Sequence, residues 1–292
     1  GEQQQQSYTK EQEEHMLQEA VQAAEEADIV VLAIGEDRLQ SGEATSNANI
    51  RIPEVQEALL DRIAEVNQNI VVVLFSGRPL DIREINKKAK AILQVWLPGT
   101  EGARAIADTL FGKYNPSGKL PMSFPYCVGQ GPVHYNEYST GRPHVEGKDK
   151  DRFRSKYLYI PNEPLYPFGY GLSYTTFEVS DIQLNQTWMD TSGQIEAEVT
   201  VKNTGNCTGT ETLQLYIHDI AASVVRPVRE LKDFKKVTLR PGEEKKVVFT
   251  ITEQQLLFLT ENGIYESEAG EFEIFIGKDS LTDNKASFVL KK

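Results

Sequence analysis

Three short, mostly apolar runs separated by stretches with helical spacing restrict what the first 112 residues can fold into. The runs are Ile29 to Ile34, Ile70 to Phe75 and Ala91 to Leu97. Runs this short and β-branched are typical of strands buried on both faces, which occur mainly in parallel sheets. Helices are expected over 11–27, 53–67, 82–87 and 101–111. This alternation predicts βαβ units on a mostly parallel sheet.

From Phe177 onward the apolar residues recur at every second position instead. We expect seven short strands, over 177–184, 195–201, 212–218, 229–239, 245–251, 270–276 and 286–290. Turn signals such as Arg240-Pro-Gly and Glu261-Asn-Gly separate them. Strands of this number and spacing predict an immunoglobulin-like or fibronectin type III-like β-sandwich.

Residues 112–175, between these two halves, are rich in Pro, Gly, Tyr and Asn and show neither period. A segment of this length is usually functional or a linker. Its aromatic residues argue against a free linker, and we expect them to pack. They are Phe124, Tyr126, Tyr135, Tyr138, Phe153, Tyr157, Tyr159, Tyr166, Phe168 and Tyr170. The predicted organisation is an α/β domain over 1–125, an interdomain clasp over 126–175 and a β-sandwich over 176–292.

Composition argues against several classes of partner and cofactor. The chain has 31 basic and 43 acidic residues, a net charge of −12, which disfavours nucleic acid and membrane surfaces but not neutral sugars. No apolar run reaches the ~20 residues of a membrane span. Two distant cysteines, Cys127 and Cys207, and four scattered histidines indicate neither a disulfide framework nor a metal site. We expect no cofactor, because Gly35 is followed by two acidic residues rather than a nucleotide-binding glycine pattern.

The loop after the first strand carries three carboxylates at the edge where parallel sheets bind ligands. Glu36 and Asp37 are interpreted as groups that orient the loop or pair with Arg38. Glu43 lies in mid-loop between Gly42 and Ala44, where little bulk hinders a ligand. Glu43 is therefore the candidate for chemistry, although most loop glutamates are simply solvated.

Several stretches resemble, in order, the signatures of glycoside hydrolase family 3. They are 27–36 (ADIVVLAIGE), 95–112 (VWLPGTEGARAIADTLFG), 115–125 (NPSGKLPMSFP), 165–177 (LYPFGYGLSYTTF), 226–234 (RPVRELKDF) and 239–243 (LRPGE). The segment 138–143 (YSTGRP) points to the periplasmic bacterial β-glucosidase type. The resemblance covers nearly everything after Asp28.

The resemblance implies a three-part enzyme that cleaves terminal β-linked glucose with retention of configuration. Such enzymes combine a (β/α)8-like barrel, an (α/β)6 sandwich and a fibronectin-like domain. By the resemblance, an aspartate on the barrel is the nucleophile and a glutamate in a Ser-Gly-Glu stretch of the second domain is the general acid/base. Ser41-Gly42-Glu43 matches that stretch, which makes Glu43 the proton donor.

Ser41, Gly42 and Arg142 are the candidate contacts to the sugar. Arg142 lies next to Gly141 in the clasp and is expected at the rim of the cleft, and the alternative for it is a surface or interdomain ion pair. Many relatives continue the acid/base loop with an Asp-Arg pair, where this chain has Ser46-Asn47. The implied fold class is a partial (α/β)6 sandwich, truncated at its start, followed by a fibronectin type III-like sandwich. The barrel is expected to be absent from this chain.

The sequence therefore predicts the C-terminal part of a periplasmic or secreted β-glucosidase, which supplies the acid/base to a cleft shared with the missing barrel. Its substrates are β-glucosides or oligosaccharides, and a preference for glucosides over xylosides stays open. We expect the isolated chain to be inactive, because the nucleophile is elsewhere. The alternative is a non-catalytic carbohydrate-binding or scaffold module, which has no use for the Ser-Gly-Glu carboxylate.

Overall fold

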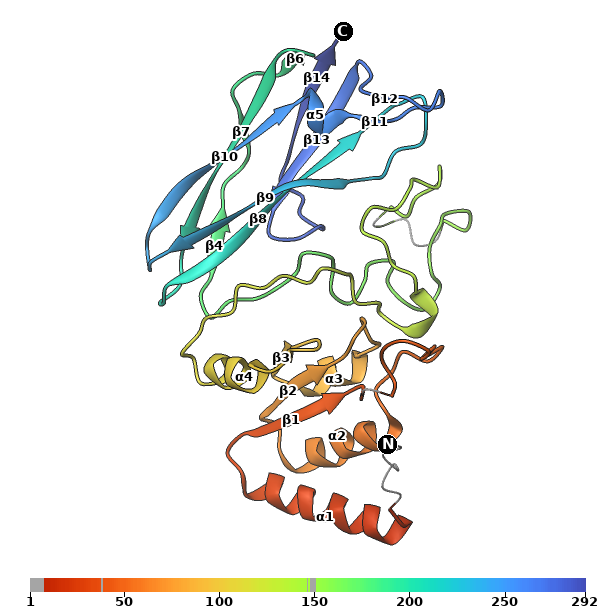
Figure 1. Cartoon of the computed structure of the whole chain (residues 1–292), viewed down its shortest axis with the longest axis vertical. Coiled ribbons are helices and arrows are strands. Elements are labelled where there is room, and N and C mark those ends of the chain that lie inside the picture. The colour runs from red at the N-terminus through yellow and green to blue at the C-terminus, as the bar shows by residue number, and fades with distance from the viewer. Residues whose placement is uncertain (1–7, 38, 146, 148–150) are drawn as a thin grey trace. The chain divides into compact units, whose positions relative to one another are not determined.

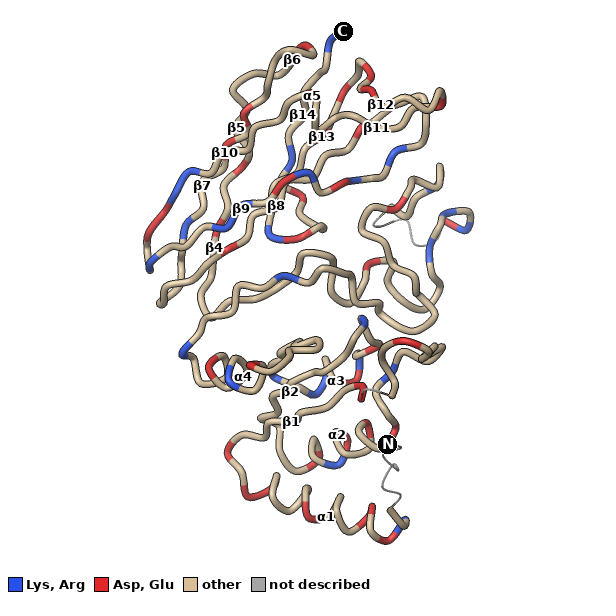
Figure 2. Tube along the Cα trace, viewed as in Figure 1, with Lys and Arg blue, Asp and Glu red and all other residues tan. Residues whose placement is uncertain are grey.

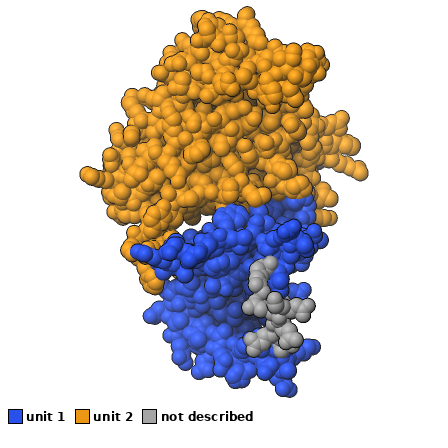
Figure 3. Space-filling model, in the orientation of Figure 1, with its two compact units in different colours: residues 1–107, 125–131 blue, residues 108–124, 132–292 orange. Residues whose placement is uncertain are grey.

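A computed structural model describes residues 8–37, 39–145, 147 and 151–292 of the chain. The chain forms two compact units (Figures 1 and 3). Unit 1 comprises residues 1–107 and 125–131, and unit 2 comprises residues 108–124 and 132–292. The first boundary falls within a helix, α4 (Gly102–Leu110).

Unit 1 is built on a three-stranded parallel sheet. Its strands follow the order β1 (Val30–Gly35), β2 (Ile70–Phe75) and β3 (Ala91–Gln94). α2 (Glu54–Val66) connects the first two strands, and α3 (Arg83–Lys88) connects the second to the third. The prediction of βαβ units on a parallel sheet is confirmed.

Helix α1 (Lys10–Glu26) precedes β1 and packs on α2. Its start is fixed by a capping box, in which Thr9 Oγ1 accepts from Gln12 N–H and Gln12 Oε1 accepts from Thr9 N–H. Within unit 1, α1 and α2 lie on the same side of the sheet (Figure 1). A short 3₁₀ helix, η1 (Val128–Gln130), also belongs to this unit.

The prediction that the first strand is buried on both faces is wrong for β1. Leu32 and Ile34 are buried, but Val31 is 51% exposed and Ala33 is also exposed. Among the described strands, β1 pairs only with β2 and lies at the edge of the sheet. Within the part of the chain that the structure describes, the face opposite α1 and α2 has little cover at this edge. The central strand β2, by contrast, is buried or half-buried at every position.

Unit 2 contains the predicted β-sandwich. One sheet has the order β10 (Glu244–Thr252), β7 (Gln194–Asn203) and β4 (Phe177–Val179), with β5 (Gln183–Leu184) also paired to β7. The other has the order β6 (Trp188–Asp190), β14 (Lys285–Lys291), β13 (Gly270–Gly277), β8 (Gly209–Asp219) and β9 (Glu230–Leu239). Alternate residues of the strands fill the core, as the burial of Ile195, Ala197 and Val199 in β7 shows.

The sandwich differs from the prediction in its shortest elements. The strand expected over 177–184 is two pieces, because the Ser180 side chain accepts a hydrogen bond from Thr200 N–H in place of the ladder. Strand β6, helix α5 (Glu253–Leu256) and the hairpin β11 (Phe258–Leu259) with β12 (Tyr265–Glu266) were not expected. Segments of two to four residues are too short to show a period.

Much of the irregular segment packs onto the sandwich within unit 2. The Tyr135 ring stacks on Phe168 at 4.2 Å between centroids and meets Tyr216 edge-on at 5.8 Å. The Lys119 ammonium lies 2.7 Å from the buried Glu211 carboxylate of β8. The expected packing is wrong, however, for four of the aromatic residues, which are exposed: Tyr138, Phe153, Tyr157 and Tyr159. That the segment clasps two domains stays a prediction.

Candidate active-site loop

The candidate loop leaves the carboxyl end of β1 at a position that only glycine can occupy. Gly35 has φ 140°, and a Cβ there would lie 1.8 Å from the Phe75 carbonyl oxygen. The Gln56 side chain of α2 holds the same residue, accepting from Gly35 N–H at 2.7 Å and donating to its carbonyl at 3.0 Å. The start of the loop is therefore fixed.

Asp37 folds the next residues into a turn. Its Oδ1 accepts hydrogen bonds from the backbone N–H groups of Leu39 at 2.7 Å and Gln40 at 3.1 Å. Its carbonyl accepts from Gln40 and Ser41 N–H. The expected loop-orienting role is confirmed for Asp37. The alternative partner, Arg38, lies outside the described residues.

Glu36 pairs with Arg78, a residue that the sequence interpretation did not select. The Glu36 side chain is 1% exposed, and Arg78 Nε lies 3.2 Å from Oε1 and 3.3 Å from Oε2. Arg78 Nη2 also donates to the Gln40 carbonyl at 2.7 Å. Arg78 follows β2 in the break 76–79 (SGRP), at the same sheet edge as Glu36, and that shared edge is the signal that could have indicated the pair.

Ser41 rests on the backbone of the same turn. A Cβ added at Gly77 would lie 2.0 Å from Ser41 Oγ, so this glycine admits the serine. The glycine has an ordinary φ, and its requirement is therefore one of space alone. Arg78 and Gly77 together hold the loop at two neighbouring positions, Gln40 and Ser41.

Glu43 lies at the tip of the loop. It is flanked by Gly42 at φ 135° and Ala44 at φ 61°, and the Thr45 hydroxyl closes the turn by donating to the Gly42 carbonyl at 2.7 Å. The Glu43 side chain is exposed and makes no hydrogen bond or ion pair with any residue that the structure describes. Of the three loop carboxylates, Glu36 is buried in an ion pair and Asp37 holds the turn. Glu43 is the one of the three that is exposed and has no hydrogen bond or ion pair with the described residues.

The far end of the loop is tied down at Asp81. Asp81 N–H donates to the Ile50 carbonyl at 2.8 Å, and its buried carboxylate accepts from Arg83 Nε at 3.0 Å and Nη2 at 2.9 Å. Burial opposes the charged carboxylate, but the Arg83 guanidinium and the Val128 N–H outweigh it, so the pKa of Asp81 is lowered.

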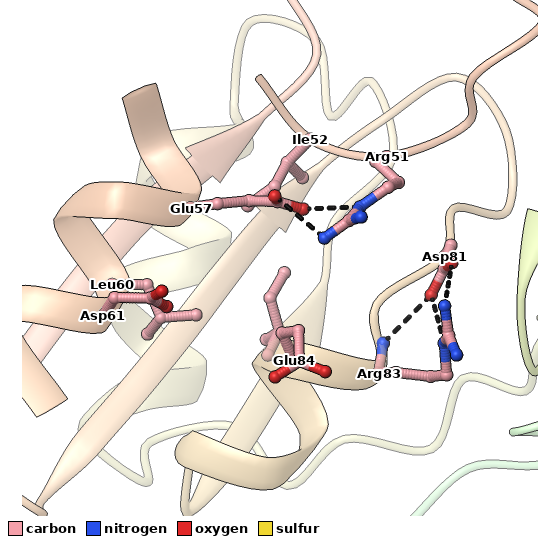
Figure 4. A pocket seen from close by; sticks show the side chains of 9 residues that line it. Arg51, Ile52, Glu57, Leu60, Asp61, Asp81, Arg83 and Glu84 are labelled. Carbon is pink, nitrogen blue, oxygen red and sulfur yellow. Dashed lines mark hydrogen bonds and ion pairs between the residues drawn. The ribbon is translucent and has the colours of Figure 1, made fainter. Parts of the chain in front are cut away.

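A small pocket beside this end does not contain the candidate residues (Figure 4). It is lined by Arg51, Ile52, Glu57, Leu60, Asp61, Asp81, Arg83, Glu84 and Ile85. Four of its charges form the pairs Arg51 with Glu57 and Arg83 with Asp81, which are drawn in Figure 4, and Asp61 and Glu84 pair with lysines outside the lining. It includes no residue of the loop 36–46, and we assign it no part in the chemistry.

The structure brings three of the four predicted site residues together. Ser41, Gly42 and Glu43 are consecutive on one loop of unit 1, whereas Arg142 belongs to unit 2. Arg142 is exposed, and its carbonyl accepts from Ser155 N–H at 2.9 Å. Its expected contact with substrate stays a prediction.

The described parts of the chain offer neither a cluster of metal ligands nor a membrane-spanning helix. No group of three His, Cys, Asp or Glu side chains there could hold a metal ion. No helix there is long and apolar enough to cross a membrane. Basic and acidic residues are interspersed along both units (Figure 2).

Comparison with known proteins gives two family matches. The description "Glycosyl hydrolase family 3 C-terminal domain" matches residues 3–174, and "Fibronectin type III-like domain" matches residues 211–280. The matches cover the loop of Glu43 and most of the sandwich respectively.

Individual relatives agree with these matches. A periplasmic beta-glucosidase of Salmonella typhimurium is 48% identical over 94% of this chain and 36% of its own length. A putative beta-xylosidase of Formosa agariphila is 38% identical over 97% of this chain and 37% of its own. The crystal structure of a beta-glucosidase from Listeria innocua in complex with glucose superposes with a TM-score of 0.90 at 40% identity, covering 98% of this chain and 39% of that one. The chain thus spans somewhat more than a third of the length of these relatives.

Proposed function

The chain belongs to glycosyl hydrolase family 3, and from that membership we propose that it supplies the general acid/base of a retaining β-glucosidase. Glu43 is the proposed acid/base. The nucleophile is an aspartate on a barrel domain that this chain does not contain. The substrates are β-glucosides or oligosaccharides with terminal β-linked glucose, and the setting is the periplasm or the exterior, as the name of the Salmonella relative suggests.

The presentation of Glu43 carries the proposal. Its carboxylate is exposed at the tip of a loop that Gly35, Arg78 and Gly77 fix at its base. A proton donor must reach the leaving-group oxygen within hydrogen-bond distance, which an exposed carboxylate on a fixed loop can do. A scaffold or simple binding module leaves this arrangement unexplained.

The chemistry divides into two steps. In the first, the barrel carboxylate attacks C1 while Glu43 donates its proton to the departing oxygen, which leaves a covalent glycosyl-enzyme. In the second, ionised Glu43 takes a proton from water as the water oxygen attacks C1, and the barrel carboxylate is released. Retaining chemistry requires the two carboxyl groups to lie about 5 Å apart, so Glu43 must face the barrel residue across the cleft.

A comparison of the two exposed loop carboxylates, Glu43 and Asp37, tests which of them acts. We expect Glu43→Gln, made in the polypeptide that joins this chain to a family 3 barrel, to lower kcat/KM on an alkyl β-glucoside by roughly 100-fold to 10,000-fold. Asp37→Asn serves as the control, because it lies on the same loop but is engaged in its turn. Equal losses in the two variants would reduce Glu43 to a structural residue.

A further inference from the structure

We propose that Arg78 is the positioning residue of the Glu43 loop, holding the proton donor in place from the end of the neighbouring strand. This inference rests on the proposed role of Glu43. It assigns no contact between Arg78 and substrate.

The first observation is the burial of its ion pair. The Glu36 side chain is 1% exposed and Arg78 is 26% exposed, and Glu36 Oε1 accepts no hydrogen bond from the described residues. A buried ion pair is often no more stabilising than apolar side chains of the same size. Stability of the fold alone therefore does not explain well why a charged pair is present at this sheet edge. The need to hold the guanidinium in one direction explains it directly.

The second observation is that one guanidinium makes two attachments. Arg78 Nε donates to Glu36 Oε2 at 3.3 Å while Nη2 donates to the Gln40 carbonyl at 2.7 Å. The planar fork of arginine permits both bonds at once, and the single ammonium of lysine does not reproduce that geometry. Glu36 thus orients Arg78, and Arg78 in turn holds the loop.

The third observation is the place of the attachment. Gln40 is three residues before Glu43, and Ser41 rests against Gly77, the residue next to Arg78. Beyond these contacts the loop reaches Glu43, whose side chain has no hydrogen bond or ion pair within the described chain. The direction of Glu43 is therefore set at positions 40 and 41.

A leaving-group comparison separates positioning from stability. The variants are Arg78→Lys and the double variant Arg78→Met/Glu36→Gln, which leaves no unpaired buried charge. They are made in the polypeptide that joins this chain to a family 3 barrel. We expect kcat/KM on an alkyl β-glucoside, which needs the acid, to fall about 100-fold, since small misplacements of a reacting group cost that much. On a dinitrophenyl β-glucoside, which needs little acid, kcat/KM is expected to fall several-fold at most.

The matched control is Arg51→Lys. Arg51 makes a two-pronged bond to Glu57 at 2.9 Å in the same unit and has no hydrogen bond or ion pair with the described residues among 36–44. It is expected to change neither substrate's kcat/KM. In a Glu43→Ala background, the Arg78 variants are expected to cause no further loss on the alkyl glucoside, because they act through Glu43.

The outcomes distinguish this inference from the proposed function. Equal losses on both substrates, or an additive loss in the Glu43→Ala background, would overturn the role of Arg78 while leaving Glu43 intact. An alkyl glucoside reaction indifferent to Glu43→Ala would overturn the proposed function first, and the inference with it.

Amide hydrogen exchange of the 292-residue chain gives a second test that needs no activity. The Arg78→Lys variant is expected to speed exchange over residues 39–45 and to leave the amides of β1 and β2 unchanged. Exchange over 39–45 that matches the parent chain would contradict the inference.

Discussion

Gly77 shows how little space the base of the Glu43 loop has. Its α-hydrogen side faces Ser41 Oγ, where a Cβ would approach within 2.0 Å. Substitution with alanine therefore has to displace Ser41 and the residues that follow it. The need for glycine at position 77 comes from Ser41, which lies 36 residues earlier in the chain, so no local sequence pattern indicates it.

Gly77→Ala is expected to lower the free energy of unfolding by about 2 kcal/mol, the usual cost of inserting a group where there is no room. Adding Ser41→Gly removes the obstructing atoms and is expected to recover most of the loss. Urea unfolding measures both. Gly118→Ala is the control, because an added Cβ there meets no atom within 4 Å. Failure of Ser41→Gly to rescue the alanine variant would contradict the packing of the loop on this turn.

The residues of the candidate loop were not equally easy to select from the sequence. Glu43 and its neighbours could be selected because they form a contiguous stretch after a recognisable strand. Arg78 could not, because its partners Glu36 and Gln40 lie 42 and 38 residues away and the pairing depends on strand order. Local patterns show which residues share a loop, whereas the sheet decides which loops meet.

At the scale of elements, Lys119 connects the irregular segment to the sandwich. It is 13% exposed, lies 2.7 Å from the Glu211 carboxylate on β8, and also donates to the Gly171 carbonyl at 2.9 Å. Glu211 is 7% exposed, so loss of the lysine would leave a buried charge without its counter-ion. This contact gives the Gly- and Pro-rich residues before 124 a defined place on β8.

We expect Lys119→Met to lower the free energy of unfolding by about 3 kcal/mol, as for other buried pairs deprived of one partner. Lys246→Met breaks a pair of equal length, 2.7 Å to Glu198, but that lysine is 70% exposed. Its loss is expected to cost under about 1 kcal/mol. Guanidinium unfolding of the two variants checks the contrast, and similar losses would contradict the anchoring role of Lys119.

Two buried aspartates give the elements opposite responses to acid. Burial raises the pKa of Asp219 at the end of β8, with the nearby Arg226 charge only partly offsetting it. The pKa of Asp81, before α3, is lowered in spite of its burial, through Arg83. An aspartate whose pKa is lowered in the folded state stabilises the fold above the ordinary aspartate pKa, and this stability is lost as the pH falls through the folded value. An aspartate whose pKa is raised in the folded state destabilises the fold at pH values above the folded pKa, and this penalty disappears as the pH falls to the ordinary aspartate pKa.

Asp81→Asn is therefore expected to destabilise the chain at pH 7, by about 2 kcal/mol for lost bonds to a charged group. The difference from the parent should shrink once the pH falls below the ordinary aspartate pKa. Asp219→Asn is expected to raise the midpoint of thermal unfolding at pH 7, and its advantage should also vanish toward pH 4. Melting Asp219→Asn at pH 7 and pH 4, and Asp81→Asn at pH 7 and at a pH below the ordinary aspartate pKa, tests the signs. Destabilisation by Asp219→Asn at neutral pH would show that its charge is needed.

Regular elements were predictable where their period was long enough to read. Helices α1 and α2 and the long strands β7 to β10 begin and end within about three residues of their expected limits. The exposure of Val31 was not predictable, because a continuous apolar run does not reveal whether its strand lies at a sheet edge. Strand pairing settles that point.

As a whole molecule, the chain carries one half of the proposed catalytic pair. The chain spans 36% of the Salmonella relative and 39% of the Listeria structure, and the proposed nucleophile belongs to the remainder. We expect the purified 292-residue chain to show negligible turnover of an aryl β-glucoside. The joined polypeptide assayed alongside it is the positive control. Robust turnover by the chain alone would contradict the assignment of the nucleophile to another domain.

The most direct test of the central claim is azide rescue of Glu43→Ala in that joined polypeptide. With a dinitrophenyl β-glucoside the first step needs little acid, so the glycosyl-enzyme should accumulate while water lacks its base. Azide attacks without a base, so we predict restored turnover with β-glucosyl azide as the product. Parental activity without azide, or no glucosyl azide with it, would contradict the role of Glu43 as the acid/base.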